Sequence, residues 1–275
     1  MKIVISHDVD HLYPSDHIPR DLIFPKLWIR SLIELLKGKI SLENCFYRFI
    51  SIFDKRLNRI PEIIEFDKRH NIPSIFFFGM DNILGMSYRK RTVVPWIKFV
   101  LEKGFDAGVH GVEYENVIKM QNEFNDFKAI SNLSSFGIRT HYVRYDIDTF
   151  KKMADVGYLF DSSEFNKWEF ELKAPYKVRT MWEFPLCIMD GYTMKNNLEI
   201  AKKLTIEVLK KANEAGLEYF TFLFHDYLFN GKTYPKQKAY YEWFINYCES
   251  QQAEFISYRK AIVELEKKHF NHIDN

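Results

Sequence analysis

The chain has 275 residues, of which 47% are hydrophobic and 17% aromatic; this is ample apolar surface for a large core and excludes a disordered or purely linking role. Its 39 basic and 37 acidic residues give a formal net charge of +2, so no large electrostatic field favours DNA, RNA or an anionic membrane as a partner. A small or neutral polar ligand suits this charge balance better.

The three cysteines, Cys45, Cys187 and Cys248, are widely spaced and odd in number, which argues against a disulfide framework and against a cysteine-rich zinc site. We therefore expect a reducing compartment. The first residues contain one lysine and a short apolar run without a small-residue cleavage site, and the longest apolar runs fall well short of the ~20 residues that span a bilayer. These features predict a cytoplasmic protein without a signal peptide or a transmembrane segment.

The strand pattern begins at the first residues and recurs along the chain. Short apolar, β-branched or aromatic runs are each followed by a longer segment of helical periodicity, which is typical of consecutive βα units. Eight strands are expected near residues 2–7, 73–79, 105–110, 138–145, 158–161, 182–189, 218–225 and 253–257. This order predicts a single α/β domain over residues 1–275, a distorted (β/α) barrel of seven or eight mainly parallel strands.

The helices between these strands carry apolar residues at i, i+3, i+4 and i+7, the periodicity of a helix that packs on one face. The clearest are Thr92–Lys103, Ile147–Val156, Leu198–Ala215 and Lys236–Ser250. A glycine follows several helical patterns and precedes a strand, where a residue able to adopt positive φ ends a helix. These glycines are Gly104, Gly137, Gly157 and Gly216.

Residues 12–60 interrupt this alternation with an aromatic-rich helical insertion between the first strand and its expected helix. The helical stretches are Trp28–Leu36 and Leu42–Phe53. Because exposed apolar patches usually meet a partner, we expect the insertion to cover the barrel mouth or to join two subunits of a homodimer.

Polar residues gather where several of the expected strands end. The C-terminal ends of the strands in an α/β barrel form one rim, where catalysis occurs, so residues far apart in the sequence should converge there. The residues at these ends are His7, Asp8 and Asp10 after the first strand, His110 at the third, Arg144 at the fourth, Asp190 after the sixth and His225 at the seventh.

The segment Ser6–His11 places four ionisable groups within five positions, directly after an apolar strand. Ionised groups so close together are costly, because like charges repel and burial removes their hydration, unless they bind a cation or share a proton. A solvated loop or a helix cap is the alternative. The two-residue spacing of Asp8 and Asp10 would let one carboxylate ligate a metal while the other reaches the bound water.

Two histidines and two arginines complete the candidate site. His110 has small neighbours that open space for a ligand, and His225 ends a strongly apolar run that delivers its imidazole to the rim. A core histidine with a structural role is the alternative for each. An arginine in a buried strand usually needs a carboxylate partner, and Arg144, which lies nearer the catalytic end than Arg139, is preferred as the residue that orients Asp8.

In their order along the chain, these segments resemble the motifs of the polysaccharide deacetylase family, also called the NodB-homology or carbohydrate esterase family four group. The resemblance covers residues 3 to about 226. The matching segments are residues 6–10 (SHDVD), 75–78 (IFFF), 108–110 (GVH), 139–145 (RTHYVRY), 157–162 (GYLFDS) and 223–225 (LFH).

The resemblance implies a carbohydrate deacetylase, a metal-dependent hydrolase that removes an N-acetyl group from an amino sugar or glycan, in surface polysaccharide biosynthesis. Asp10 and His110 would ligate a divalent metal ion, with zinc the first choice. Asp8 would act as the base, and His225 would protonate the leaving amine. The physical logic is that a divalent metal polarises the amide carbonyl and acidifies water, while a carboxylate accepts the water proton.

Two positions depart from the family pattern. The family places a second ligand histidine four residues after the first, where this chain has Tyr114, and the proline of the arginine motif is replaced by His141. A phenol with a reference pKa of about 10 is a reluctant ligand. The candidates for the third ligand are therefore Glu113, Tyr114, Glu115 and His11, and we expect weaker metal binding than at a complete Asp-His-His site.

Other assignments remain open at this point. Asp161 or Asp190 would support the catalytic histidine. The substrate could be another small amide or ureide, since some proteins of this fold act on such compounds. A catalytically silent carbohydrate-binding barrel is a third possibility.

Overall fold

The computed structural model describes residues 1–18, 20–166, 172–194 and 197–273. Its strands are β1 Lys2–Val9, β2 Ile75–Phe78, β3 Asp106–Gly111, β4 Ile138–Thr140, β5 Phe160–Asp161, β6 Tyr176–Val178, β7 Met181–Glu183, β8 Ile188–Met189, β9 Tyr219–Leu223 and β10 Glu254–Phe255. Its α-helices are α1 Pro14–His17, α2 Ile23–Leu36, α3 Leu42–Ile50, α4 Ile60–Arg69, α5 Lys90–Glu102, α6 Val117–Ser131, α7 Thr149–Val156, α8 Asp190–Thr193, α9 Leu198–Glu214, α10 Pro235–Ser250 and α11 Tyr258–Ile273. Three 3₁₀ turns are η1 Ser51–Phe53, η2 His141–Val143 and η3 Asp226–Leu228.

One mainly parallel sheet forms the centre of the molecule, with the order β6-β7-β5-β4-β3-β2-β1-β9-β8 and with β10 beside β1. The segment from β7 to β8 pairs with β5 at its start and with β9 at its end, so the sheet curls back on itself. A sheet of parallel strands is normally buried on both faces, and its strands read as continuous apolar runs. Accordingly β9 is buried throughout and β1 is buried after its first residue. The expected distorted α/β barrel is confirmed.

Several strand limits differ from those expected. The predicted strand at 138–145 ends at Thr140, because the chain turns into η2, where Tyr142 and Val143 have φ values of 63° and 47°. The predicted strand at 182–189 is divided into β7 and β8 around Pro185, which has no N–H to donate. The short antiparallel partner β6 of β7 was not expected from the sequence.

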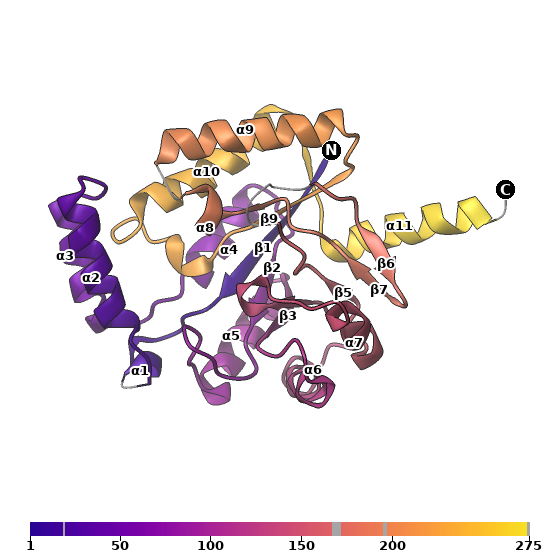
Figure 1. Ribbon diagram of the computed structural model, residues 1–275, viewed down its shortest axis with the longest axis horizontal. Coiled ribbons are helices and arrows are strands. Elements are labelled where there is room, and N and C mark those ends of the chain that lie inside the picture. The colour runs from indigo at the N-terminus through magenta and orange to yellow at the C-terminus, as the bar shows by residue number, and fades with distance from the viewer. Residues whose placement is uncertain (19, 167–171, 195–196, 274–275) are drawn as a thin grey trace.

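Helices surround the sheet, and the inserted segment stands to one side of it (Figure 1). In that view α9 and α10 lie above the strands, and α5, α6 and α7 lie below them. Helices α2 and α3 pack side by side as a hairpin on the side toward which β1 points. The insertion therefore adjoins the C-terminal ends of the strands, where the candidate site residues lie.

The predicted helix-ending glycines Gly104, Gly157 and Gly216 have positive φ, whereas Gly137 does not. Helix α6 ends instead at Asn132, which adopts the left-handed conformation with a φ of 57°. Gly137 is required for a different reason, since a Cβ atom there would lie 2.2 Å from the ring of Phe160. This close approach lets β4 and β5 lie side by side below the site.

Candidate active site

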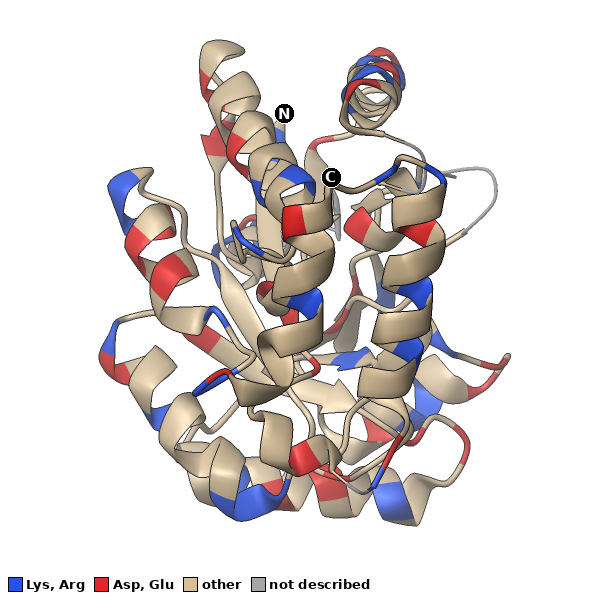
Figure 2. Ribbon diagram, turned by 90° about the vertical axis from the view of Figure 1, so that its left-hand side faces the viewer, with Lys and Arg blue, Asp and Glu red and all other residues tan. Residues whose placement is uncertain are grey.

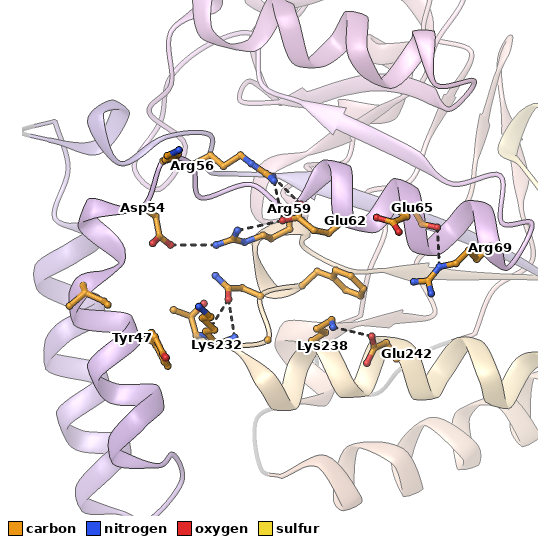
Figure 3. Close-up of a pocket in the computed structure, with 16 residues that line it drawn as sticks. Tyr47, Asp54, Arg56, Arg59, Glu62, Glu65, Arg69, Lys232, Lys238 and Glu242 are labelled. Carbon is orange, nitrogen blue, oxygen red and sulfur yellow. Dashed lines mark hydrogen bonds and ion pairs between the residues drawn. The ribbon is translucent and has the colours of Figure 1, made fainter.

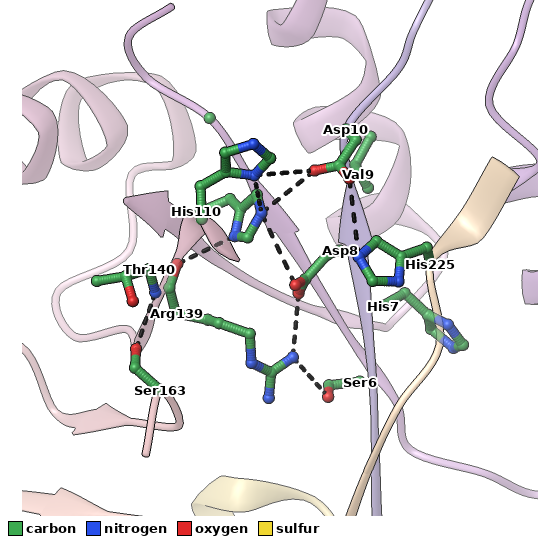
Figure 4. Close-up of polar contacts among 12 residues, drawn as sticks. Ser6, His7, Asp8, Val9, Asp10, His110, Arg139, Thr140, Ser163 and His225 are labelled. Atoms are coloured by element: carbon green, nitrogen blue, oxygen red, sulfur yellow. Dashed lines mark hydrogen bonds and ion pairs between the residues drawn. The ribbon is translucent and has the colours of Figure 1, made fainter. Parts of the chain in front are cut away.

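Three side chains from separate segments meet at the C-terminal rim of the sheet. Asp10 follows β1, His110 lies in β3, and His141 opens the turn after β4. The Asp10 Oδ1 atom lies 3.2 Å from His110 Nε2 and 3.3 Å from His141 Nδ1, and the two imidazole nitrogens are 3.0 Å apart. All three residues are buried, and one ligand atom from each falls within 4.8 Å of the others. Figure 4 shows Asp10 and His110 at this point of the rim.

One ring nitrogen of His110 is held by the backbone, which leaves the other to face Asp10 and His141. His110 Nδ1 lies 3.0 Å from the carbonyl oxygen of Arg139; a carbonyl only accepts, so Nδ1 carries the proton, and Nε2 of a neutral ring keeps its lone pair. Asp10 Oδ1 is buried without a well-aligned hydrogen bond. Although burial acts against ionisation, His141 and His110 hold the pKa of Asp10 well below its usual range. Two nitrogens and one carboxylate oxygen in this arrangement suit a divalent cation.

The structure corrects the expectation for the third member of this group. Glu113 accepts hydrogen bonds from the backbone N–H groups of the three residues that follow it. The guanidinium of Arg144 lies over the Tyr114 ring, 5.0 Å from the ring centroid. The His11 ring packs against the Tyr227 ring, with the centroids 4.7 Å apart and the planes tilted by 55°. Among the described residues, His141 takes the place for which Glu113, Tyr114, Glu115 and His11 were candidates.

Arg139, and not Arg144 as preferred from the sequence, holds Asp8. Its Nη1 atom donates to Asp8 Oδ1 at 3.0 Å and to Ser6 Oγ at 2.8 Å. Its other nitrogens bond to Ser162 and Tyr258, so the buried guanidinium cannot easily turn away.

Arg144 lies outside this contact because β4 stops at Thr140 and the chain changes direction. Its guanidinium donates to the carbonyl oxygens of His141 at 3.2 Å and Val112 at 3.1 Å. Arg144 thus ties the loop that carries His141 to the loop after β3.

His225 and Asp190 form the second pair of the site. Asp190 Oδ2 accepts the backbone N–H of His225 at 2.6 Å, and Asp190 Oδ1 lies 2.9 Å from His225 Nδ1. Between the two aspartates left open by the sequence, the contact is with Asp190; Asp161 instead bonds to Ser163. Burial alone would lower the pKa of His225, but the Asp190 carboxylate outweighs it and raises the pKa to about 10. The His225 Nε2 atom lies 3.7 Å from Asp10 Oδ2.

A cavity of about 370 Å³ gives access to these groups. Its lining includes Asp8, Asp10, His141 and His225 together with Ile23 and Lys26 of α2, so the inserted hairpin forms part of its wall. A larger cavity of about 610 Å³ lies between α3, α4 and the loop after η3 (Figure 3). Its charged side chains largely pair with each other, as in the contacts Arg59–Asp54 at 3.4 Å and Lys238–Glu242 at 3.2 Å. The smaller cavity is therefore the candidate active site.

His141 is the site residue that the sequence pattern did not assign. It was treated as a replacement for a proline inside the strand expected at 138–145, and it comes to lie at a strand end because β4 stops at Thr140. From the sequence, Asp226, the residue directly after His225, was assigned no role. It is buried, accepts the backbone N–H of Arg59 at 2.8 Å, and has a pKa raised by burial to about 8.

No protein-family model matches the chain, and no curated protein sequence matches it at a significant level. Solved structures are similar to it in fold. A protein from Mycobacterium smegmatis, provisionally named a polysaccharide deacetylase, is 12% identical with a TM-score of 0.61, over 98% of this chain and 91% of that one. A provisionally named polysaccharide deacetylase from Pseudomonas aeruginosa PAO1 is 14% identical with a TM-score of 0.58, over 96% and 89%.

Puue allantoinase is 13% identical with a TM-score of 0.57, over 94% of this chain and 87% of that one. At these identities the likeness concerns the fold. The chain thus has the fold of the NodB-like polysaccharide deacetylases over nearly its whole length, as the order of its motifs predicted.

Proposed function

We propose that the protein is a metal-dependent hydrolase that removes the N-acetyl group from an amino sugar. The observation that carries this proposal is the meeting of three kinds of group in one cavity. These are an Asp-His-His cluster, a carboxylate fixed by an arginine, and a histidine paired with a carboxylate. Each group suits one requirement of amide hydrolysis: polarising the carbonyl, taking the proton of water, and protonating the leaving nitrogen.

Asp10, His110 and His141 would hold the divalent ion. A set of one carboxylate and two imidazoles matches the three protein ligands of catalytic zinc sites, so zinc is the ion proposed. A bound divalent cation supplies Lewis acidity, polarising the amide carbonyl and acidifying water. The carbonyl oxygen of Arg139, which lies 3.0 Å from His110 Nδ1, fixes the tautomer that leaves Nε2 free to ligate.

Asp8 is proposed as the general base. Arg139 holds Asp8 Oδ1, while Oδ2 points toward the cluster, 3.7 Å from His110 Nε2. A carboxylate held in this way can accept the proton of the attacking water without rotating. The oxygen of that water forms the new bond to the acetyl carbon.

His225 is proposed as the general acid. With its pKa raised to about 10 by Asp190, the ring is protonated at neutral pH. Its Nδ1 faces Asp190, so Nε2 is the nitrogen that remains for the substrate. When the carbon–nitrogen bond of the amide breaks, the nitrogen takes this proton and leaves as the free amine.

The biosynthesis of a surface polysaccharide in the cytoplasm is the proposed setting. The three cysteines are free and buried, as suits a reducing compartment. No helix in the described part of the chain is long and apolar enough to cross a membrane. The fold that the chain shares with an allantoinase supports a different small amide or ureide as the alternative substrate.

The test is product analysis with purified protein. Free, nucleotide-linked and lipid-linked N-acetylated amino sugars would be incubated with the zinc-loaded protein, and acetate and free amine would be measured. We expect equal amounts of the two products, no release with a chelator, and recovery when zinc is added back. Allantoin serves as the matched amide control. Turnover of allantoin alone, or none with any N-acetylated sugar, would contradict the proposal.

A further inference from the structure

The α2–α3 hairpin exposes an unusually apolar surface. Of the twenty exposed large hydrophobic side chains in the described residues, nine belong to residues 12–60. In α2 the exposed positions Ile29, Leu32, Ile33 and Leu36 have the spacing i, i+3, i+4 and i+7, which places them along one face of the helix. At the tip Leu36 is 87% exposed, and Leu42 is 74% exposed.

These exposed residues are not the ones that hold the hairpin together. Phe24 is buried, and Trp28 stacks on Phe49 with ring centroids 5.7 Å apart. The hairpin thus has an inner set of aromatic contacts and a separate outer apolar face. Figure 2 looks onto this side, where the ribbons of α2 and α3 carry few charged positions. A patch of this kind on a folded protein usually marks a contact surface.

The charges around this face are mainly positive. Residues 12–60 contain nine basic and five acidic residues, a formal charge of +4, against +2 for the whole chain. Glu34 is already paired with Arg30 and Arg48, and Asp54 with Arg59.

Four lysines surround the hairpin tip. Lys37 and Lys39 lie between the exposed leucines and have no acidic partner among the described residues. Lys232 comes from the loop before α10, and its carbonyl accepts from Asn44. Lys236 lies in the first turn of α10, and its ammonium donates to the Lys39 carbonyl. Glu43, next to Leu42, adds one negative charge, so the tip is apolar with a net positive charge.

We propose that the α2–α3 hairpin docks on the surface of an anionic lipid bilayer. Leucines enter the boundary between headgroups and acyl chains, while lysines beside them meet the lipid phosphates. The 14 residues of α2 reach about 21 Å, less than the hydrocarbon thickness of about 30 Å, so the hairpin lies on the surface and does not span it. A second copy of this chain fits the face less well. If the α2–α3 hairpins of two copies packed against each other, their positively charged tips would lie close together and repel.

This docking would place the candidate active site beside the membrane. Ile23 and Lys26, near the start of the same helix, line the cavity that contains Asp8 and His225. A bilayer under the outer face of α2 would lie next to that opening. A substrate carried on a membrane lipid could then reach the cavity without leaving the surface.

The test is vesicle flotation with the full chain. Vesicles of phosphatidylglycerol and phosphatidylcholine would be compared with vesicles of phosphatidylcholine alone, at low and high salt. We expect the protein to float with the anionic vesicles and to be released by salt. The double change Lys37→Gln with Lys39→Gln should weaken binding about tenfold to thirtyfold, since each lysine near such a surface contributes on the order of 1 kcal/mol. Leu36→Gln with Leu42→Gln should also reduce it at least about tenfold.

Matched controls use the same changes elsewhere on the surface. Lys203→Gln with Lys211→Gln alters two exposed lysines of α9, and Ile147→Gln alters a side chain that is 91% exposed. These variants should bind as the parent does. No binding to anionic vesicles, or equal loss in the control variants, would overturn the proposal. So would a dimer in light scattering that dissociates when Leu36 and Leu42 are changed, because the second copy would then be the occupant.

Discussion

The position of Asp8 depends on Arg139 at the scale of single residues. The guanidinium is buried, and its donors reach Asp8, Ser6, Ser162 and Tyr258. Removing the partner of a buried charge costs several kcal/mol, so this arrangement resists change. The consequence is a carboxylate held at one place in the cavity by a guanidinium that is itself fixed.

Asp8→Asn should separate proton transfer from metal binding. The amide keeps the shape of the side chain but is not a base, so we expect kcat to fall about a hundred- to ten-thousand-fold. Bound zinc should stay near the parental level, because Asp10, His110 and His141 are the proposed ligands. Turnover and zinc content would be measured on the same preparation. Near-normal turnover by the variant would show that Asp8 is not the general base.

Tyr114→His should not improve the metal site. From the sequence, a histidine at 114 would restore the family spacing and tighten zinc binding. In the structure the Tyr114 ring packs against the Arg144 guanidinium and is not part of the cluster that His141 completes. We therefore expect equal zinc affinity in calorimetric titrations of the variant and the parent. A tighter site would mean that the loop after β3 reaches the metal.

The candidate site residues that end regular strands could be predicted from the sequence. Asp10, His110 and His225 follow apolar runs whose C-terminal ends must share one rim. Arg139 and His141 were missed or ranked second because their positions depend on where β4 stops. The strand ends at Thr140, and two residues with positive φ then redirect the chain. A propensity pattern carries no signal for such a turn in the sequence His-Tyr-Val, since β-branched and aromatic residues favour strand.

At the scale of elements, two glycines beside β4 leave no room for a side chain beneath the site. A Cβ atom at Gly137 would lie 2.2 Å from the Phe160 ring, and one at Gly108 would lie 2.7 Å from the Gly137 carbonyl oxygen. Phe160 itself is stacked on Tyr258, with ring centroids 4.4 Å apart. These rings have little room to move aside.

Gly137→Ala should therefore destabilise the protein by about 1–3 kcal/mol, the range for overpacking a filled core. The change should be read from chemical denaturation as a lower midpoint with an unchanged slope. Gly191→Ala is the control, because a Cβ atom there meets nothing within 4 Å. Equal stability of the two variants would show that the sheet relaxes around Phe160.

The elements themselves followed from periodicity where the chain is regular. The expected helices at Thr92–Lys103 and Leu198–Ala215 correspond to α5 and α9 within two residues at each end. The β6–β7 hairpin was not foreseen, because the exposed residues of Tyr176–Val178 form no apolar run. The tight packing at Gly137 depends on a residue 23 positions later in the chain, so a local pattern cannot show it.

At the scale of the whole molecule, several carboxyl groups are buried with no cationic partner among the described residues. Glu123 accepts the backbone N–H of Val112 at 2.9 Å, while its Oε2 atom is buried without a partner. Burial raises its pKa to about 8. Burial also raises the pKa of Glu183, which adjoins Asp161. Near neutral pH these carboxyl groups are therefore protonated in the folded chain and ionised in the unfolded chain.

The free energy of unfolding should therefore fall as the pH rises from about 4.5 toward 8. Glu123 stays protonated over that range only when the protein is folded, so its stabilising effect is present at low pH and lost as the pH approaches its folded pKa. Glu123→Gln keeps the acceptor for Val112 and removes the titration, so the variant should show a shallower slope and be more stable at pH 8. Denaturation curves across this range decide it. An unchanged slope would show that Glu123 is ionised in the folded protein.

The overall composition did not predict how charge and apolar side chains are distributed over the surface. A net charge of +2 conceals a helical insertion of charge +4 whose outer face is apolar. Which residues of α2 are exposed depends on which side of the helix packs inward. Aromatic and aliphatic residues alternate along this helix, so the sequence is compatible with more than one buried side. The overall class of fold was easier to predict, because it rests on the order of many elements.

The most direct test of the account is a zinc titration of metal-free protein by calorimetry. The parent and His70→Ala, which changes a surface histidine paired with Glu249, should each bind one zinc ion per chain. Changes to residues that only support the metal ligands typically weaken metal binding about 10- to 100-fold. His141→Ala removes a proposed ligand, so it should weaken zinc binding by more than that. Zinc binding by His141→Ala equal to that of the parent, or no stoichiometric binding by the parent, would contradict the assignment of Asp10, His110 and His141 as the metal site.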